Sequence, residues 1–575
     1  MLRRIFSYMK EYKKYAWLAL ICIGVEVVLE IMVPKLMADL IDIGVTNSDV
    51  PYIITKGIQM AVCAVAALIL GVGSARFSAL AGQGLGANIR KAEYEKLQSY
   101  SFSNIDHFSV SSLVTRLTSD VTNIQNAVST GMRPFGRSPV MLIFATTLAF
   151  QINSTLALVF LVALPVLAVM LIIIIINVGP RYGRMQGAVD LVNRCIEENL
   201  TAVRVVKSYV RGDYEIEKFR NVNDNLKNES EKAFGIAVLN MPAMQFVMYS
   251  TILGILLIGG RLINSGQMMI GQLTSFLSYV LLILNSLMMM SNVFLLMTRS
   301  LASAERIMKV IDEPIDITDE NAKDIEVKKG EIEFNHVWFK YKDTAKEYVL
   351  SDVSFHINAG QTVGIIGQTG SSKTTLIQLI PRLYDASKGE IKIDGINVKE
   401  YPVRHLRDAI SVVLQKNTLF SGSLIDNLRW GDENATLDEI KEACSIACVD
   451  EFIDRLPGGL DAEMGQEGVN VSGGQKQRIC IARAILKKPK VLILDDSTSA
   501  VDTATEGKIR NALAKKLPDM TKIIIAQRIS SVYHADQIII MDGGRVDAIG
   551  THESLLKTNK IYQEIYESQK EGADL

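Results

Sequence analysis

Six long apolar segments in the first 300 residues limit most strongly what this chain can fold into. Each is near the ~20 residues that a helix needs to cross the hydrocarbon core of a bilayer. The third is short by itself, and we expect it to continue from the helical stretch before it. We therefore predict six membrane-spanning helices. The segments are Trp17–Ile41, Ile53–Arg76, Pro134–Phe150, Leu156–Val178, Met241–Ile263 and Ile270–Met297.

The composition agrees with a membrane-embedded part. Hydrophobic residues make up 49% of the 575 residues, and the mean hydropathy is +0.21. The formal net charge is -1, so no global field favours nucleic acid as a partner. The six cysteines are scattered without the spacing of metal ligands, and we expect free thiols.

The distribution of basic residues orients these helices. Residues 180–234 carry ten Lys and Arg, whereas the loops 44–52, 151–154 and 264–269 carry none. The positive-inside rule therefore places the N-terminus and residues 180–234 in the cytoplasm. Six spans return the chain to the cytoplasm for everything after residue 300. We predict a multi-pass protein of the cell membrane, inner or plasma, with the bilayer as an obligatory partner.

Two long polar stretches, residues 77–133 and 180–240, keep helical periodicity with few breakers. They predict helices that extend well beyond the bilayer. The segment Ser208–Phe219 could turn at Gly212 and dock on a cytoplasmic domain, or it could be a solvated charged loop. We favour docking, because flexible loops of this length are uncommon in compact proteins.

The sequence pattern changes after the last apolar segment. Residues 312–329 are polar and acidic, as in a linker. From Gly330 onward, short β-type runs alternate with helical stretches, which predicts an α/β domain with a largely parallel core sheet. We therefore divide the chain into a helical membrane domain (residues 1–311), a linker (312–329) and an α/β domain (330–575).

A glycine loop in residues 362–380 has the order strand, loop, helix. In such a loop, glycines permit the tight turn, and backbone N–H groups and the helix N-terminus face phosphates. Lys373 would neutralise the β- and γ-phosphates, and Thr374 would offer its hydroxyl to Mg²⁺. The strict pattern has glycine where Ser372 stands, but the strand–loop–helix context favours phosphate binding over a chance Gly/Ser turn. The candidate phosphate-binding residues are Gly367, Gln368, Thr369, Gly370, Ser371, Ser372, Lys373, Thr374 and Thr375.

An acidic pair ends the apolar run 491–494. Asp495 suits a Mg²⁺ shell, and Asp496 stands where an ATPase places a carboxylate to polarise the attacking water. Gln415 follows another β-type run and could reach the metal or the water. The expected metal ligands are thus Thr374, Gln415 and Asp495, and the expected cofactors are ATP and Mg²⁺.

A second candidate anion site opens the helix at residues 471–486. Ser472 supplies a hydroxyl, Gly473 and Gly474 supply amides, and Gln475 follows at the helix N-terminus. The alternative is a plain helix cap. Two phosphate-binding ends far apart in one domain are explained most simply if they serve different nucleotides across a dimer.

The motifs GQTGSSKTT, VSGGQ, VLILDD and SAVD, the last ending at Asp502, resemble the nucleotide-binding domain of an ABC transporter. Six spans followed by one such domain resemble a half-transporter of the bacterial multidrug-type ABC exporters over nearly the whole chain, including residues 198–209 and 300–307. The resemblance implies a dimer with domain-swapped helices and two ATP molecules between the nucleotide-binding domains. It implies nucleotide contacts for Asp502 and adenine stacking for Tyr341, for which a plain strand tyrosine is the alternative.

The chain departs from this family at three positions. The catalytic glutamate corresponds to Asp496, one methylene shorter, and the switch histidine to Gln527, which offers a hydrogen bond to the γ-phosphate but no charge. A misplaced general base typically forfeits ~10²–10⁴ in rate. Together with Ser372, these departures lie on the phosphate-loop face, whereas the signature VSGGQ shows none. We therefore predict a heterodimer with a homologous half-transporter that has the glutamate and the histidine.

The resemblance implies ATP-driven export of small hydrophobic or amphipathic compounds, such as drugs or lipids, from the cytoplasm. ATP binding and hydrolysis would be coupled to alternating access. One alternative is an ATP-gated channel or regulatory subunit, which would show passive flux; another is a dedicated lipid or peptide exporter. An ATPase that is merely anchored to the membrane agrees poorly with six spans.

Glu26 and Glu30 lie four residues apart in the first span, hence on one helical face. Carboxylates inside a membrane are costly and usually face a cavity. They could attract cationic cargo, or they could pair with Arg76, Arg133 or Arg137. The sequence favours neither interpretation.

Overall fold

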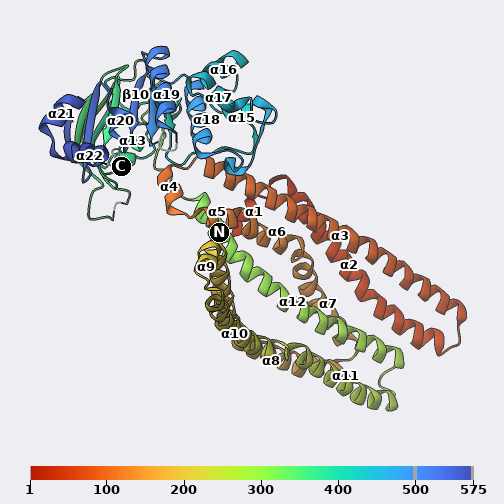
Figure 1. Ribbon diagram of the computed structural model, residues 1–575. Helices are drawn as coiled ribbons and strands as arrows, with labels where there is room; N and C mark the ends of the chain where they lie inside the picture. Colours follow the sequence, from red (N-terminus) through yellow and green to blue (C-terminus); the bar gives the residue numbers. More distant parts are fainter. Residues whose placement is uncertain (1, 343, 497–500, 572–575) are drawn as a thin grey trace. The chain divides into compact units, whose positions relative to one another are not determined.

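The computed structural model describes residues 2–342, 344–496 and 501–571 (Figure 1). The chain divides into two compact units. The first comprises Met1–Leu97 and Ser111–Asp312, and the second comprises Gln98–Val110 and Glu313–Leu575. A short segment from the helical half of the sequence therefore belongs to the second unit.

The first unit is helical. Within the described residues, five helices are long and apolar enough to cross a membrane. The predicted count of six spans stays a prediction; the predicted fourth span lies on α8, whose side chains are only partly described. The helices of this unit are α1 (Leu2–Ser7), α2 (Lys13–Asp39), α3 (Val50–Gln98), α5 (Val110–Thr115), α6 (Val121–Ser129), α7 (Met132–Ile152), α8 (Ser154–Thr201), α9 (Val203–Ser208), α10 (Gly212–Ala237), α11 (Asn240–Asn264) and α12 (Ile270–Ile311).

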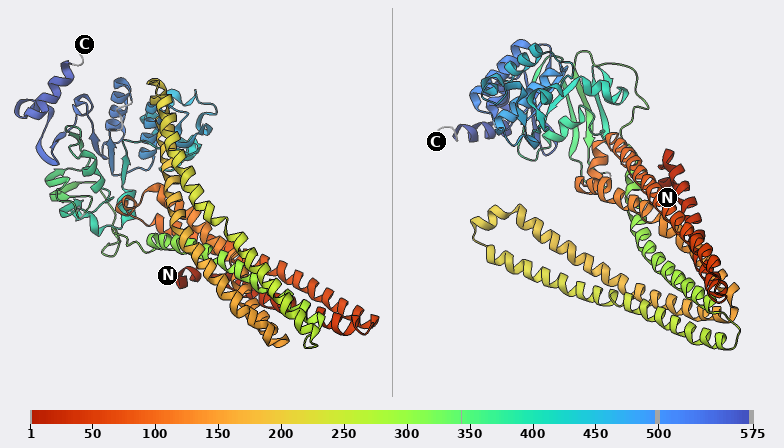
Figure 2. Two further views of the ribbon diagram at one scale, coloured as in Figure 1. Left: turned by 90° about the horizontal axis from the view of Figure 1, so that it is seen from below. Right: turned by 90° about the vertical axis from the view of Figure 1, so that its right-hand side faces the viewer.

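The long polar stretches are helical, as predicted. α3 continues past its apolar part to Gln98, and α8 continues to Thr201. Figure 2 shows α8 and α10 as the two arms of a long hairpin. The turn between α9 and α10 lies at residues 209–211, just before the expected Gly212, and Val210 takes the left-handed backbone conformation there (φ 53°).

Close helix packing in the first unit depends on small residues and on one helix cap. A Cβ at Gly82 would lie 2.8 Å from the Gln125 carbonyl oxygen, and one at Gly86 would lie 2.6 Å from Gln125 Oε1, so only glycine lets α3 approach α6 this closely. The Asp42 carboxylate accepts hydrogen bonds from the backbone N–H groups of Gly271 (2.6 Å) and Gln272 (3.0 Å) at the start of α12. This capping joins the start of α12 to the helical turn Leu40–Val45 that follows α2.

The second unit is built on a six-stranded sheet with the order β12-β11-β3-β10-β9-β6, parallel from β11 to β6. This confirms the predicted α/β domain with a largely parallel core. A four-stranded antiparallel sheet (β2-β1-β4-β5) and the short pair β7–β8 complete it. The strands are β1 (Ile332–Phe339), β2 (Leu350–Ile357), β3 (Thr362–Ile366), β4 (Lys388–Ile393), β5 (Ile396–Asn397), β6 (Ile410–Val413), β7 (Gly422–Ser423), β8 (Glu463–Met464), β9 (Val491–Asp495), β10 (Thr521–Ile525), β11 (Gln537–Asp542) and β12 (Arg545–Gly550).

Three buried central strands position the candidate site. β3, β10 and β9 are neighbours, with Ile525 in register with Ile365 on one side and with Asp495 on the other. Because the strands are parallel, the loops that follow them meet at one edge of the sheet, where ligands of such folds bind. The helices of this unit are α4 (Phe102–His107), α13 (Lys373–Leu379), α14 (Val403–Asp408), α15 (Leu424–Arg429), α16 (Leu437–Ile446), α17 (Asp450–Ile453), α18 (Gly473–Leu486), α19 (Thr503–Lys516), α20 (Ile529–Val532), α21 (His552–Thr558) and α22 (Lys560–Glu571).

The predicted linker lies along the second unit rather than free of it. The Asp394 carboxylate accepts hydrogen bonds of 2.7–3.0 Å from the backbone N–H groups of residues 328–331. Asp319 Oδ1 accepts one from the Val403 N–H (2.9 Å). These bonds order a stretch whose polar composition alone would suit a flexible connection.

Helix α4 is attached to the rest of the second unit by side-chain hydrogen bonds. The Tyr384 hydroxyl donates to Asp106 Oδ2 (2.6 Å), and its ring lies 6.1 Å from that of Phe102. Burial, followed by the Asp106 carboxylate, raises the pKa of Tyr384 above its usual value, so this hydroxyl remains a donor. The Asn104 side chain adds a hydrogen bond to the Pro314 carbonyl (2.8 Å).

Candidate nucleotide site

In the phosphate loop between β3 and α13, the lysine side chain is hydrogen-bonded to other residues of the loop. Lys373 Nζ donates to the carbonyl oxygens of Gly367 and Gln368 (both 2.8 Å) and to Ser371 Oγ (3.1 Å). Burial lowers the pKa of Lys373, because the ammonium group loses water at this position. The lysine thus stands at the N-terminus of α13, where the motif predicts contact with phosphates.

The backbone explains why the strict motif has glycine before the lysine. Ser372 has φ 68° and ψ 23°, a left-handed conformation that costs a non-glycine residue roughly 1–2 kcal/mol. Gly370 has φ 87°, and a Cβ at Gly367 would lie 2.1 Å from the Met541 carbonyl oxygen. The two glycines are therefore required by geometry, and Ser372 keeps the loop conformation at a cost in strain.

β9 delivers Asp495 to the same edge of the sheet, where its side chain is only 2% exposed. Thr374 Oγ1 lies 3.3 Å from Asp495 Oδ1, and within the described residues Asp495 Oδ2 is buried without a hydrogen-bond partner. Burial raises the pKa of Asp495, opposed by the Thr374 hydroxyl. A buried carboxylate oxygen that lacks a partner beside a hydroxyl suits a hard cation such as Mg²⁺.

The carboxylate of Asp496 is contacted by two side chains that come from other predicted motifs. Asp496 Oδ2 accepts hydrogen bonds from Gln527 Nε2 (3.0 Å) and from Gln415 Nε2 (3.5 Å). Burial raises the pKa of Asp496, and the two amides oppose that shift. Asp496 also has φ 47°, so its backbone takes the left-handed conformation. Its carboxylate is thus held by neutral amides, without a cationic side chain at position 527.

Tyr341 lies beside the helix that follows the phosphate loop. Its hydroxyl group is 2.9 Å from Thr375 Oγ1 and 3.3 Å from Gln378 Oε1. Phe339 and Tyr384 pack against its ring edge-to-face at 4.9 and 5.2 Å, and the side chain remains 43% exposed. Stacking of this ring on adenine stays a prediction.

The signature residues cap a helix. Ser472 Oγ accepts from the Gln475 N–H (3.3 Å), and Gln475 Oε1 accepts from the Ser472 N–H (2.9 Å), a capping box at the start of α18. The cap that we weighed as an alternative is therefore present, while Gly473 and Gly474 remain open to solvent or partly so. Among the described residues, Ser472 and Gln475 bond to each other and not to the phosphate loop of the same domain.

Asp502 also caps a helix. Its Oδ1 accepts a hydrogen bond from the Thr505 N–H (2.9 Å) at the start of α19, and this bond lowers the pKa of Asp502. Residues 497–500, which hold the first half of the SAVD motif, lie outside the described residues.

In the first unit, Glu26 and Glu30 pair with arginines of α7. Arg133 donates to Glu26 Oε1 (2.6 Å), while Arg137 approaches Glu26 Oε1 (3.4 Å) and Glu30 Oε2 (2.7 Å). Within the described residues, Arg76 forms no ion pair. Both carboxylates line a cavity of about 750 Å³ together with Arg133, Ser278, Asn285 and mainly apolar side chains. We considered cargo binding and pairing with arginines for these glutamates, and the structure contains the contacts of the second interpretation.

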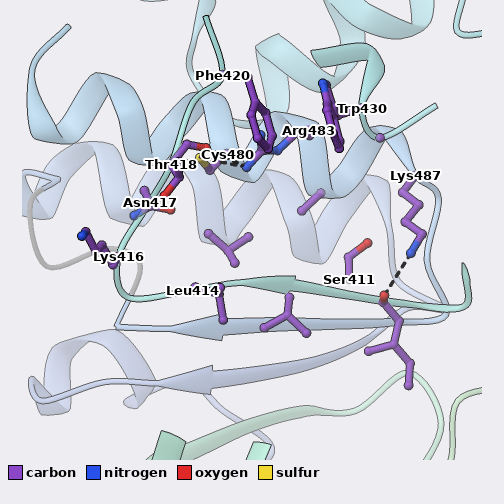
Figure 3. A pocket seen from close by; sticks show the side chains of 15 residues that line it. Ser411, Leu414, Lys416, Asn417, Thr418, Phe420, Trp430, Cys480, Arg483 and Lys487 are labelled. Atoms are coloured by element: carbon purple, nitrogen blue, oxygen red, sulfur yellow. Dashed lines mark hydrogen bonds between the residues drawn. The ribbon is translucent and has the colours of Figure 1, made fainter. Parts of the chain in front are cut away.

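A second cavity, of about 320 Å³, lies between β6 and α18 (Figure 3). At its mouth the rings of Phe420 and Trp430 stack with centroids 4.2 Å apart. Arg483 donates to the Thr418 carbonyl (3.2 Å), and Lys487, which also lines the cavity, donates to the Ile410 carbonyl (3.3 Å). No motif marked these residues in the sequence, since they come together only when the strand and the helix pack.

Known protein families match both halves of the chain. The ABC transporter transmembrane region matches residues 16–287, and the ABC transporter domain matches residues 350–499. The chain is 37% identical to the uncharacterized ABC transporter ATP-binding protein YfiB of Bacillus subtilis (strain 168) over 575 residues, all of both chains. It is 32% identical to the ATP-dependent lipid A-core flippase of Pseudomonas putida (strain KT2440), covering 98% of this chain and 95% of the flippase.

The fold agrees with these matches. The solved structure of a bacterial Atm1-family ABC exporter with ATP bound superimposes with a TM-score of 0.84 at 22% identity, covering 97% of this chain and 99% of that chain. The phosphate loop, the Asp495 carboxylate and the capped signature helix occur in one domain that hydrolyses ATP to drive transport. Carrying a transmembrane region and an ATP-binding domain in a single polypeptide, the chain belongs to the ABC transporter family.

Proposed function

We propose that the protein is one subunit of a heterodimeric exporter with two unequal ATP sites. Its phosphate loop would form a degenerate site that holds ATP and hydrolyses it poorly. Its signature residues would complete the competent site of a homologous partner that has the glutamate and the histidine. The N-terminus and the nucleotide-binding domain would lie in the cytoplasm, and ATP binding and hydrolysis would drive alternating access across the cell membrane.

The observation that carries this proposal is the environment of Asp496. Its short carboxylate is hydrogen-bonded by the amides of Gln415 and Gln527. Position 527 therefore offers no cationic side chain to the γ-phosphate, and the carboxylate has less reach toward a water. Ser372 adds backbone strain in the same loop. The signature helix, in contrast, has its full cap and exposed glycine amides. Defects on one face beside an intact second face favour two different subunits over two copies of this chain.

Thr374 and Asp495 are the residues we expect to hold Mg²⁺, with Gln415 as a further ligand. The partnerless Asp495 Oδ2 supports this assignment. Bound there, the metal would supply positive charge to the β- and γ-phosphates. Within the described residues, groups of three or more His, Cys, Asp or Glu that could hold a metal are absent, so the phosphates of ATP would complete the ligand set.

The cavity beside α18 is the surface on which we expect the partner's cytoplasmic helical turn to dock. The Phe420–Trp430 stack and the Arg483 and Lys487 cations offer apolar area together with charge. The equivalent turn of this chain is exposed, with Val210 87% and Tyr209 76% accessible, as suits a docking element. Docking of Ser208–Phe219 on a nucleotide-binding domain thus stays our proposal.

The membrane cavity favours an amphipathic cargo over a simple cation. Arg133 and Arg137 offset the charges of Glu26 and Glu30, and the remaining lining is mainly apolar. One relative, the ATP-dependent lipid A-core flippase, is named for a lipid. We infer export of small hydrophobic or amphipathic compounds, either drugs or lipids. An ATP-gated channel is the second candidate; uphill accumulation of cargo in inverted vesicles excludes it, and passive flux with bound ATP would favour it.

Asp496→Asn tests the assignment of the two sites. We expect that the assembled transporter keeps its ATP turnover, within about twofold, because hydrolysis occurs at the partner's site. The partner is obtained by co-purification with this chain, and turnover is measured as phosphate release. Replacing the partner's catalytic glutamate by glutamine should abolish turnover. The reverse pattern, or vigorous hydrolysis by this chain purified alone, would overturn the heterodimer proposal.

The Glu26→Gln/Glu30→Gln double variant tests the role of the membrane carboxylates. If the ion pairs are structural, uptake of a cationic dye into inverted vesicles should stay unchanged while thermal stability falls, because two arginines lose their carboxylate partners. The matched variant Arg133→Gln/Arg137→Gln should lower stability in the same way. Loss of dye uptake only in the glutamate variant would instead assign cation binding to Glu26 and Glu30.

A further inference from the structure

The C-terminal helix α22 reaches the loop that carries the switch residue. Gln569 Nε2 donates to the Gln527 carbonyl oxygen (2.7 Å), and Gln569 Oε1 accepts from the Ile529 N–H (2.9 Å). One side-chain amide therefore bonds to the backbone on both sides of Arg528. We propose that Gln569 is a positioning residue that sets where the Gln527 side chain lies in the nucleotide site.

The backbone segment that Gln569 bonds to, residues 527–529, carries the Gln527 side chain. The Gln527 side chain donates to Asp496 Oδ2 (3.0 Å), so a shift of its backbone moves the amide relative to the acidic pair. Upstream, the Ala526 N–H donates to the Ile365 carbonyl (3.3 Å); downstream, Arg510 donates to the Ser530 carbonyl (2.9 Å). Gln569 holds the residues between these two attachments.

Helix α22 is firm enough to act as the support. Tyr562 is fully buried, and its hydroxyl lies 2.7 Å from His552 Nδ1 of α21. Asn559 Oδ1 accepts from the Tyr562 N–H (2.9 Å) in the first turn. Ile561 and Ile565 pack against the buried core of the domain, so the helix presents Gln569 from a fixed base.

The loop has room to move once Gln569 is removed. A cavity of about 780 Å³ adjoins it, lined by residues 527–530, Tyr533, Tyr566, Gln569 and Lys570. On the side of this cavity the loop has space around it, and the two hydrogen bonds from Gln569 add to the attachments at Ala526, Ile529 and Ser530. The part of this inference that concerns nucleotide binding rests on the proposed function, together with the hydrogen bond that we expect from Gln527 to the γ-phosphate.

The test compares Gln569→Ala with Gln563→Ala in the full-length chain. Gln563 is the matched control, since it also donates from α22 to a backbone carbonyl, that of Leu556 (2.7 Å), but away from the switch loop. Amide hydrogen exchange of residues 526–530 and affinities for ATP and for ADP are measured. One lost hydrogen bond is typically worth about a three- to tenfold change in an equilibrium.

For Gln569→Ala we expect amide exchange at residues 527–529 to rise about tenfold and the ratio of ATP to ADP affinity to fall about three- to tenfold. ADP affinity should stay unchanged, because ADP lacks the γ-phosphate.

Gln569→Glu keeps an acceptor for the Ile529 N–H, so it should preserve protection at Ile529 and still lose ATP preference. Gln563→Ala should change none of these quantities. In a Gln527→Ala background, Gln569→Ala should have no further effect on the ATP-to-ADP ratio.

Unchanged exchange at residues 527–529 in Gln569→Ala, or equal effects of the Gln563 and Gln569 variants, would overturn the proposal. So would faster exchange with unaltered ATP preference, if Gln527→Ala alone lowers that preference. If Gln527→Ala leaves the preference unchanged, the hydrogen bond that we expect from Gln527 to the γ-phosphate fails, and the part of this inference that concerns nucleotide binding fails with it. The exchange data then still decide whether Gln569 holds the loop.

Discussion

The Asp496→Glu/Gln527→His double variant is expected to raise the ATPase rate of the chain purified alone by at least ~10²-fold, the lower end of what a positioned general base contributes. The longer carboxylate regains its reach toward a water, and histidine can offer charge to the γ-phosphate where glutamine offers only an amide. Two copies of this chain already carry intact signatures, so no further residue is needed. Phosphate release in detergent or nanodiscs gives the rate.

The control for this gain is the same double variant with Lys373→Ala, which should return the rate to background because phosphate binding is lost. Adding Ser372→Gly should raise the rate or the stability further, since it removes the cost of the left-handed serine. If the double variant binds ATP and dimerises yet stays inactive, the degenerate positions are not what limits hydrolysis, and the assignment of Asp496 and Gln527 is wrong.

The second large effect is expected from Gly473→Asp in the signature. A carboxylate at the first position of α18 favours the helix dipole, so the fold should be kept, but it repels the phosphate that the signature would bind across the dimer. We expect the assembled transporter to lose turnover by on the order of 10²-fold or more, as when a charge-stabilising group is removed from an active site. Photolabelling of this chain by an azido-ATP should persist, because its own phosphate loop is intact.

Two variants bracket that result. Lys373→Ala should give the opposite pattern, with photolabelling of this chain lost and most of the turnover retained. Gly507→Asp places the same charge in α19, where a Cβ meets nothing within 4 Å, and should change neither quantity. Retained turnover in Gly473→Asp would show that the signature of this chain serves no catalytic site.

The sequence predicted most of the second unit because its signals are local. Alternation of apolar residues indicated the strands, and motif glycines indicated the phosphate loop; the structure then assembled Thr374, Asp495, Gln415 and Gln527 around one edge of the sheet. Motif order was sufficient for this, because parallel strands bring their carboxyl ends together. The number of spans stays a prediction, since hydropathy marks an apolar segment and not its crossing of the bilayer.

The sequence did not predict which side chains far apart in the chain contact one another. It left three arginines open for Glu26 and Glu30, and packing of α2 against α7 selected Arg133 and Arg137. It marked Ser472 and Asp502 as nucleotide residues, while the structure also uses both as helix caps.

By itself, the sequence determined that the chain has an apolar helical half and an α/β ATP-binding half. It also predicted that one catalytic face departs from the family pattern while the signature matches it. Periodicity and short motifs depend on neighbours a few residues apart, so they can be read along the chain. Only the tertiary structure decided that α4 joins the second unit, with Tyr384 bonded to Asp106, and that Gln569 of α22 bonds to the backbone of Gln527 and Ile529. The contacts of Tyr384 with Asp106 and of Gln569 with Gln527 join residues 278 and 42 positions apart, and such pairs arise only from how whole elements pack.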